Sequence, residues 1–140
     1  MIVIDEYLAV DVLRGNWPDG LPDDDQLGLP ATHHYRLLQR VHQPGSGRLS
    51  RILAGLSDAG RDAIRRPHPD IVEVLDSRPL LDPAAQIAAR YGTGGLLFTE
   101  TLAAGLAHRR TLYFGTDDNV GERFASIAAD LGITITILAN

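Results

Sequence analysis

Short apolar runs separated by helical patterns constrain the fold of this chain more than any other feature. Residues 1–4, 71–76, 111–116 ("TLYFGT") and 133–138 ("ITITIL") each have the length and the alternating or β-branched composition of a strand. Strands joined through helices run parallel, because a crossover returns the chain to the same end of the sheet. The sequence therefore predicts an α/β fold: a three-layer α/β/α sandwich with a mainly parallel sheet of about four to five strands. No linker divides the chain, so we expect one domain over residues 1–140.

Helical periodicity fills most of the sequence between these strands. In residues 82–92, "DPAAQIAARYG", we expect Asp82 as the N-cap, Pro83 at the first helical position and Gly92 at the end. The segment "NWPDGLPDDDQLGLP" (16–30) is rich in Pro, Gly and Asp and is predicted to be a long loop. The other helices are predicted over residues 6–15, 31–43, 48–60, 96–109 and 119–132.

Composition limits the kinds of site that this chain can carry. It has no cysteine, which excludes disulfides and thiolate metal sites. No apolar run approaches the ~20 residues of a membrane span, and the start lacks the basic segment of a signal peptide, so we expect a cytoplasmic protein. The net charge of -5 argues against binding nucleic acid by bulk attraction, and nothing indicates DNA.

Acidic residues follow two of the predicted strands. Asp5 comes directly after the first strand, and Asp117 and Asp118 follow "TLYFGT". Because parallel strands end at the same edge of a sheet, both strands deliver carboxylates to one edge, where open α/β sheets form their sites. Glu100 lies in the apolar helix "LLFTETLAAGLAHR", where it either turns outward or is paired with a cation. Glu6 is more simply explained as a first-turn acid favoured by the helix dipole.

Carboxylates that converge repel one another unless a divalent cation lies between them. An oxygen-only ligand set favours Mg²⁺ or Mn²⁺ over zinc. Such a centre suits phosphodiester hydrolysis, because the metal activates a water molecule and neutralises charge on the phosphate.

The order of these segments resembles the PIN-domain family of metal-dependent nucleases, which includes toxins of bacterial toxin–antitoxin modules. The match consists of an apolar strand ending in Asp ("MIVID"), a helix opened by an acid ("ETLAAGLA", 100–107), a strand with a Thr-x-Asp turn ("LYFGTDDN") and a closing "AADLGITITIL". "IVEVLDSRPLLDPAAQIAARYG" (71–92) is similar to the strand and helix that precede the family's third acid.

The resemblance implies a Mg²⁺- or Mn²⁺-dependent ribonuclease, with Asp5, Glu100 and Asp118 as catalytic metal ligands and Asp117 as the alternative to Asp118. It further implies single-stranded RNA as substrate, an antitoxin protein as partner and a homodimer. The family's second acid is missing, since residues 31–43 contain none and Tyr35 lies near its place. The alternative is therefore a catalytically degenerate PIN-like binding module.

Two other groups of residues are candidates for binding. Arg65, Arg66 and His68 form a basic hook that is either a contact for RNA or an acidic partner, or a solvated loop. His33 and His34 lack the spacing of a metal pair with His42, so we interpret them as helix-surface or interface residues.

Overall fold

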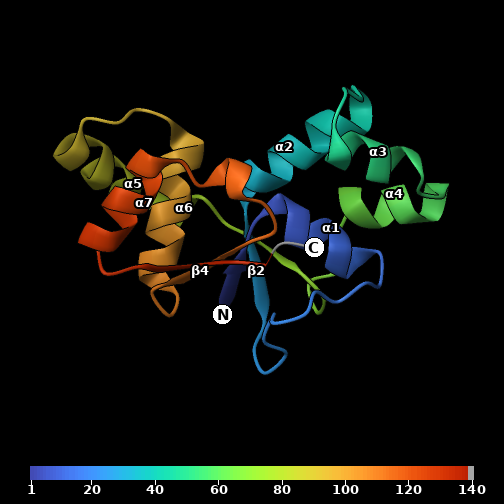
Figure 1. Cartoon of the computed structure of the whole chain (residues 1–140), viewed down its shortest axis with the longest axis horizontal. Helices are drawn as coiled ribbons and strands as arrows, with labels where there is room; N and C mark the ends of the chain where they lie inside the picture. The colour runs from blue at the N-terminus through green and yellow to red at the C-terminus, as the bar shows by residue number, and fades with distance from the viewer. Residues whose placement is uncertain (139–140) are drawn as a thin grey trace.

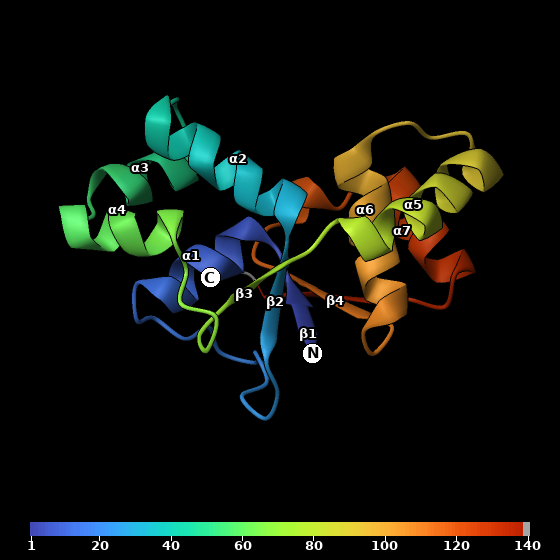
Figure 2. The ribbon, with the colours of Figure 1, turned by 180° about the vertical axis from the view of Figure 1, so that it is seen from behind.

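The structure, a computed structural model, describes residues 1–138 and has one five-stranded, all-parallel sheet with helices on both faces (Figures 1 and 2). The predicted α/β sandwich is confirmed. The strands lie in the order β3-β2-β1-β4-β5. Their bounds are β1 Ile2–Ile4, β2 Leu27–Pro30, β3 Glu73–Leu75, β4 Thr111–Phe114 and β5 Thr134–Ile137. The helices are α1 Glu6–Leu13, α2 Ala31–His42, α3 Arg48–Ala54, α4 Asp58–Arg65, α5 Arg78–Tyr91, α6 Leu96–Ala107 and α7 Glu122–Asp130, with a 3₁₀ turn η1 at Asp117–Asn119.

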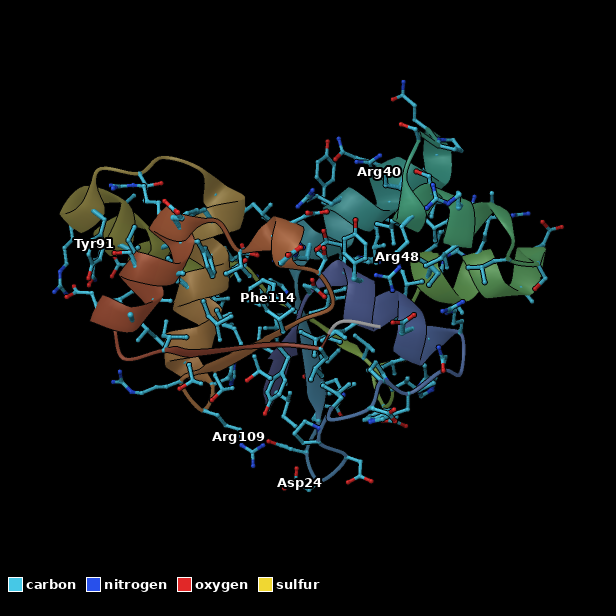
Figure 3. The ribbon with its side chains drawn as sticks, in the orientation of Figure 1. Asp24, Arg40, Arg48, Tyr91, Arg109 and Phe114 are labelled. Atoms are coloured by element: carbon cyan, nitrogen blue, oxygen red, sulfur yellow. The ribbon has the colours of Figure 1, made fainter. Side chains whose placement is uncertain are left out.

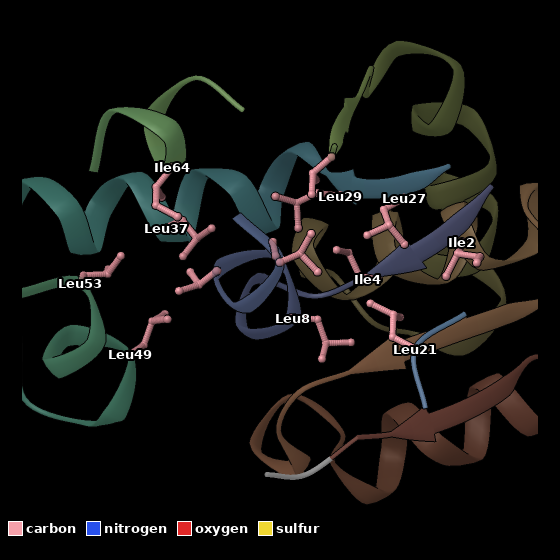
Figure 4. Close-up of a cluster of buried hydrophobic side chains, with 14 residues drawn as sticks. Ile2, Ile4, Leu8, Leu21, Leu27, Leu29, Leu37, Leu49, Leu53 and Ile64 are labelled. Carbon is pink, nitrogen blue, oxygen red and sulfur yellow. The ribbon is translucent and has the colours of Figure 1, made fainter. Parts of the chain in front are cut away.

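The central strand β1 is apolar on both faces and so divides the protein into two cores. Ile2 and Ile4 belong to one core, which β2 and helices α1, α2, α3 and α4 complete (Figure 4). Val3 points the other way, into a core formed with β4, α5, α6 and α7. Side chains alternate across a strand, so a three-residue strand can supply both cores only if it is apolar throughout. This explains the uniform "IVI" of β1.

The sheet brings three chain segments to one edge. β1 pairs with β2 through Val3 and Gly28, and with β4 through Ile4 and Tyr113. All three strands end on the same side, where they lead directly into α1, α2 and η1. Residues that directly follow these strands are therefore neighbours in space, although they are distant in sequence.

Three predicted boundaries are wrong. β2 lies inside the segment predicted to be a loop, and its short sequence "LGLP" carries too little pattern to be recognised. The helix predicted over 48–60 is two helices, because Ser57 starts α4 by accepting a hydrogen bond from the Gly60 backbone at 3.0 Å. Helix α5 starts at Arg78 instead of Asp82, so Pro83 lies inside it. The predicted end at Gly92 is confirmed, with φ +67°.

Candidate acidic site at the carboxyl edge of the sheet

Asp5 joins the end of β1 to the start of α1 and is 1% exposed. As the N-cap of α1 it accepts a hydrogen bond from the Leu8 backbone N–H at 3.0 Å, through Oδ1. The same oxygen accepts the Gly115 backbone N–H at 3.0 Å, which ties it to the end of β4. Its second oxygen, Oδ2, accepts from the side-chain amide of Asn119 at 3.2 Å. The carboxylate therefore holds β1, α1 and the turn after β4 together.

Glu6 is buried beside Asp5 and does not simply begin the helix, as the sequence suggested. It is 1% exposed, and Asn119 donates to its Oε1 at 3.1 Å while also bonding Asp5. The guanidinium of Arg36 lies 3.3 Å from the same oxygen, and the ring of His33 bonds Oε2. The first-turn position in α1 is as predicted. However, the side chain belongs to a buried polar network that sequence periodicity did not reveal.

His33 is buried at 2% exposure, so its interpretation as a helix-surface or interface residue is wrong. Its Nε2 lies 2.8 Å from the Thr101 hydroxyl, which itself donates to the Leu97 carbonyl at 2.6 Å. Because that hydroxyl proton is already used, Nε2 must be the donor to Thr101. Nδ1 faces the carboxylate of Glu6, which only accepts when ionised. Both ring nitrogens are therefore used in the network, Nδ1 with Glu6 and Nε2 with Thr101.

Glu100 is fully buried in α6, so the outward-facing alternative is wrong. Its Oε1 accepts from the backbone N–H of Thr32 at 3.2 Å and from the Thr32 hydroxyl at 3.1 Å. Its Oε2 is buried and has no hydrogen-bond partner among the described residues. Thr32 precedes His33 in α2, and Thr101 follows Glu100 in α6. Glu100 is thus held against the same two segments that carry the Glu6–His33–Thr101 contacts.

The two acids that follow β1 differ in their ionisation. Burial, and secondly the negative charge of Glu6, raise the pKa of Asp5 from 3.8 to about 6, against the backbone hydrogen bonds that lower it. Burial also acts to raise the pKa of Glu6. There, the hydrogen bond and charge of His33, followed by the charge of Arg36, outweigh it, so this pKa is lowered. Glu6 therefore ionises at lower pH than Asp5, and its charge makes ionisation of Asp5 less favourable.

Asp117 and Asp118 lie outside this network. Both are exposed in η1, and within residues 1–138 no hydrogen bond or ion pair joins either side chain to the buried acids. Thr116 starts the turn by accepting the Asp118 backbone N–H at 3.2 Å, as its place in the predicted Thr-x-Asp turn requires. The next residue, Asn119, is the one that reaches Asp5 and Glu6. Of the predicted acids, the structure connects Asp5 and Glu100 to the buried network and leaves the two turn acids on the surface.

A cavity of about 180 Å³ opens beside the network. Phe98, Phe114 and Phe124 form its apolar wall, with the ring of Phe124 packed edge-on against the other two at 5.0 and 5.7 Å. Its polar wall consists of His33, Thr101 and Asn119. Phe114 lies at the centre of the molecule, between the two groups of helices (Figure 3). The cavity gives a small molecule or solvent a route to the polar network.

A divalent cation needs carboxylate oxygens whose lone pairs are not already used in hydrogen bonds. In residues 1–138, no three His, Asp or Glu side chains are arranged to hold a metal ion together. Mg²⁺, however, is commonly held by one or two carboxylates, with water and substrate phosphate filling its other positions. Among the described residues, Glu100 Oε2 has no hydrogen-bond partner and Asp5 Oδ2 accepts one hydrogen bond. The described residues therefore do not fit an all-protein cage, and the lone pairs that Glu100 and Asp5 keep suit a cation whose other positions are filled by water or phosphate.

Two of the three basic residues in the hook lie beside acids that are close in sequence. Arg66 lies 3.3 Å from Asp62, one turn earlier in α4, and His68 lies 3.7 Å from Asp70. Arg65 ends α4 and is exposed. These contacts are distant from the buried acids in the chain and join no described residue of the acidic site. Its role in binding RNA or a partner stays a prediction.

A comparison with models of known protein families, one with curated proteins and one with solved structures each gave no match. The resemblance to PIN domains accordingly rests on the order of sequence segments quoted above. In the part of the chain that the structure describes, no helix is both long and apolar enough to cross a lipid bilayer.

Sequence reasoning missed His33, Arg36 and Asn119, and assigned Glu6 only a local role. One signal was present for His33: residues 33, 37 and 41 recur every four positions in α2, and Leu37 is fully buried. The face that carries Leu37 thus places His33 inward as well. Tyr35, near the expected place of a second acid, is instead 61% exposed. No comparable pattern indicated Arg36 or Asn119, because their roles depend on how α2 and η1 meet.

Proposed function

We propose that this chain is a PIN-like domain that acts as a Mg²⁺- or Mn²⁺-dependent endoribonuclease. One observation supports this most: three carboxylates are almost fully buried, with Asp5 and Glu6 at the carboxyl end of β1 and Glu100 on α6 against Thr32 of α2. Burying a charged carboxylate costs free energy, and buried acids with shifted pKa values occur mainly at functional sites. The raised pKa of Asp5 and the unpartnered Glu100 Oε2 are what a cation would relieve.

In this proposal Asp5 and Glu100 hold the cation, which when bound supplies Lewis-acid stabilisation of the phosphate and activates water. The other residues have roles of their own. Asn119 fixes the positions of Asp5 and Glu6 by donating to both. His33 keeps Glu6 ionised and in place. The side chain of Arg36 is 38% exposed, so an RNA phosphate can accept hydrogen bonds from the guanidinium N–H groups that remain available.

The test is cleavage of a fluorescent single-stranded RNA with Mn²⁺ present. Asp5→Asn and Glu100→Gln should each lower the rate at least a hundredfold while leaving the circular dichroism spectrum unchanged. Asp82→Asn, at an exposed acid of α5, is the matched control and should cleave normally. Asp118→Asn asks whether the turn contributes a further ligand when RNA is bound. Full activity of the Asp5 and Glu100 variants would refute the proposal.

A second function is favoured by the pairing of Glu6. Arg36 places a cation against this carboxylate and the ring of His33 bonds it, so part of the charge that a metal would neutralise is already balanced. A degenerate PIN-like module that acts by binding a partner would have this arrangement. Calorimetric titration with Mn²⁺ separates the two functions. Stoichiometric binding that Glu100→Gln removes supports the nuclease, and no heat at millimolar Mn²⁺ supports the binding module.

A further inference from the structure

A second cavity, of about 430 Å³, lies at the far end of α1 from the acidic site. It is formed where the end of α1 and the segment after it meet α3. We name it the arginine pocket. Its main lining residues are Arg14, Asn16, Trp17, Asp19, Arg48 and Arg51.

The arginine pocket carries an excess of positive charge. Arg14 is held by Asp11, whose Oδ1 accepts its Nε at 3.2 Å and one terminal nitrogen at 2.9 Å. The guanidinium of Arg48 stacks over the Tyr7 ring at 5.7 Å. Neither Arg48 nor Arg51 forms an ion pair with an acid among the described residues, so both can bind an anion. Arginine is the residue best suited to phosphate, because its planar fork donates two parallel hydrogen bonds.

Trp17 gives the same pocket a flat aromatic wall. Its indole N–H donates to the Leu21 carbonyl at 2.9 Å, which fixes the ring although the side chain is 44% exposed. The turn that presents it is bounded by Gly15 and Gly20, both at φ +86°, where other residues would be strained. An anchored, exposed indole is a surface on which a nucleobase can stack with little loss of side-chain entropy.

Trp17 also borders a region of opposite charge. There the ring borders a cavity lined by Asp23, Asp24, Asp25 and Asp70. Figure 3 shows Asp24 and Arg48 at separate places on the molecule, below the sheet and on the helical side respectively. A polyanion approaching Trp17 is repelled from the aspartate side and attracted to the arginine side. The charge distribution thus selects one direction of approach.

We propose that the arginine pocket binds one nucleotide of single-stranded RNA, with its phosphate on Arg48 and Arg51 and its base stacked on Trp17. The inference rests on the proposed function, and it adds a substrate subsite outside the acidic site. Helix α1 joins the two: Asp5 is its N-cap and Arg14 its C-cap. Nine residues at 1.5 Å each separate them by about 14 Å along the axis. Most of α1 is buried, so an RNA bound at both places would cross the surface between them and not lie along the helix itself.

The experiment uses Trp17 as its own reporter, because it is the only tryptophan in the chain. A short oligouridylate is titrated into the protein in EDTA, so that no cleavage occurs, and indole fluorescence is recorded. We expect saturable quenching that weakens as salt is raised. The variant Arg48→Gln/Arg51→Gln should bind about tenfold more weakly. Arg78→Gln/Arg90→Gln, which removes two exposed arginines elsewhere, is the matched control and should bind like the wild type.

A second measurement keeps the result independent of the reporter. Fluorescence anisotropy of a labelled oligouridylate should show Trp17→Ala binding about tenfold more weakly, the usual effect of losing one stacked base. Equal affinity of the wild type and both pocket variants would overturn the inference. Stronger quenching by an acidic peptide than by RNA would overturn it in favour of a protein partner.

The outcomes also separate this inference from the proposed nuclease. If the pocket variants lose RNA affinity while Asp5→Asn cleaves normally, the arginine pocket stands and the metal-dependent site fails. If Asp5→Asn is inactive while the pocket variants bind and cleave like the wild type, the nuclease stands and the arginine pocket fails.

Discussion

Replacing Asp5 with asparagine should stabilise the folded protein, although it should abolish the proposed activity. Burial beside Glu6 raises the pKa of Asp5 from 3.8 to about 6. Each pKa unit is about 1.4 kcal/mol, so keeping Asp5 ionised in the metal-free protein costs about 3 kcal/mol at neutral pH. Asparagine is an equally good N-cap and keeps an oxygen for the Leu8 and Gly115 backbone N–H groups.

The substitution has one cost of its own. The new amide nitrogen faces the Asn119 donor that bonds Asp5 Oδ2, and losing that hydrogen bond costs about 1 kcal/mol. The expected net effect of Asp5→Asn is therefore a gain of about 2 kcal/mol in the free energy of unfolding. Its pH dependence follows from the sign of the shift. The folded state holds the proton more tightly, so the wild type loses stability as pH rises from about 4 to about 6.

The assay is urea unfolding in EDTA at several pH values between 4 and 8. The stability difference between Asp5→Asn and the wild type should be small near pH 4 and reach its full size above pH 6. Asp117→Asn, at an exposed acid, is the control and should change little at any pH. Added Mn²⁺ should stabilise the wild type and leave Asp5→Asn unchanged. An Asp5→Asn protein that is less stable than the wild type at pH 7 would refute the reasoning.

Three further predictions concern the residues around this carboxylate. His33→Leu removes the buried partner of the Glu6 carboxylate and should lower the free energy of unfolding in urea at pH 7 by about 3–5 kcal/mol; a loss below about 1 kcal/mol would contradict the importance of this contact. The pKa of Glu6 is lower in the folded protein than its ordinary 4.5, so ionised Glu6 stabilises the fold above pH 4.5, and this stabilisation is lost as pH falls through the folded pKa. Glu6→Gln should therefore be less stable than the wild type at pH 7, and the difference in free energy of unfolding should shrink below pH 4.5. A difference that does not change with pH would argue against this. Gly115→Ala would place a Cβ 2.8 Å from the Tyr7 Cβ, so it should lower the free energy of unfolding by about 1–3 kcal/mol and lower the melting temperature with it. In the control Gly121→Ala, the new Cβ meets nothing within 4 Å, and this variant should melt near the wild type.

The fold was predictable where segments carry strong periodicity or chemistry of their own. The β-branched run of β5 and the alternating run of β4 identified both strands, and Gly92 marked the end of α5. β2 could not be recognised, because "LGLP" becomes a strand only through pairing with β1 and β3 on either side. Pro83 suggested a helix start by its usual preference. The structure places it inside α5, where packing of Leu80, Ala84 and Ile87 against α6 outweighs the lost hydrogen bond.

The sequence likewise placed some residues of the candidate site and left others open. The position of Asp5 after an apolar strand sufficed to place it at the carboxyl edge of the sheet, because connection rules in α/β folds leave little freedom there. The burial of Glu100 was left open by its sequence. It is decided by Thr32, which lies sixty-eight positions earlier and supplies two donors to one carboxylate oxygen.

The sequence by itself determined the class of fold and the presence of acids at one edge of the sheet. Both follow from local periodicity and chain direction, which a single segment carries. Only the tertiary structure decided which acids are buried, which are compensated and which stay in solvent. Those outcomes depend on α2 delivering His33 and Arg36 to Glu6, and on η1 turning Asn119 inward while Asp117 and Asp118 face outward. The energy of a buried charge is set by its neighbours, and its neighbours here come from distant parts of the chain.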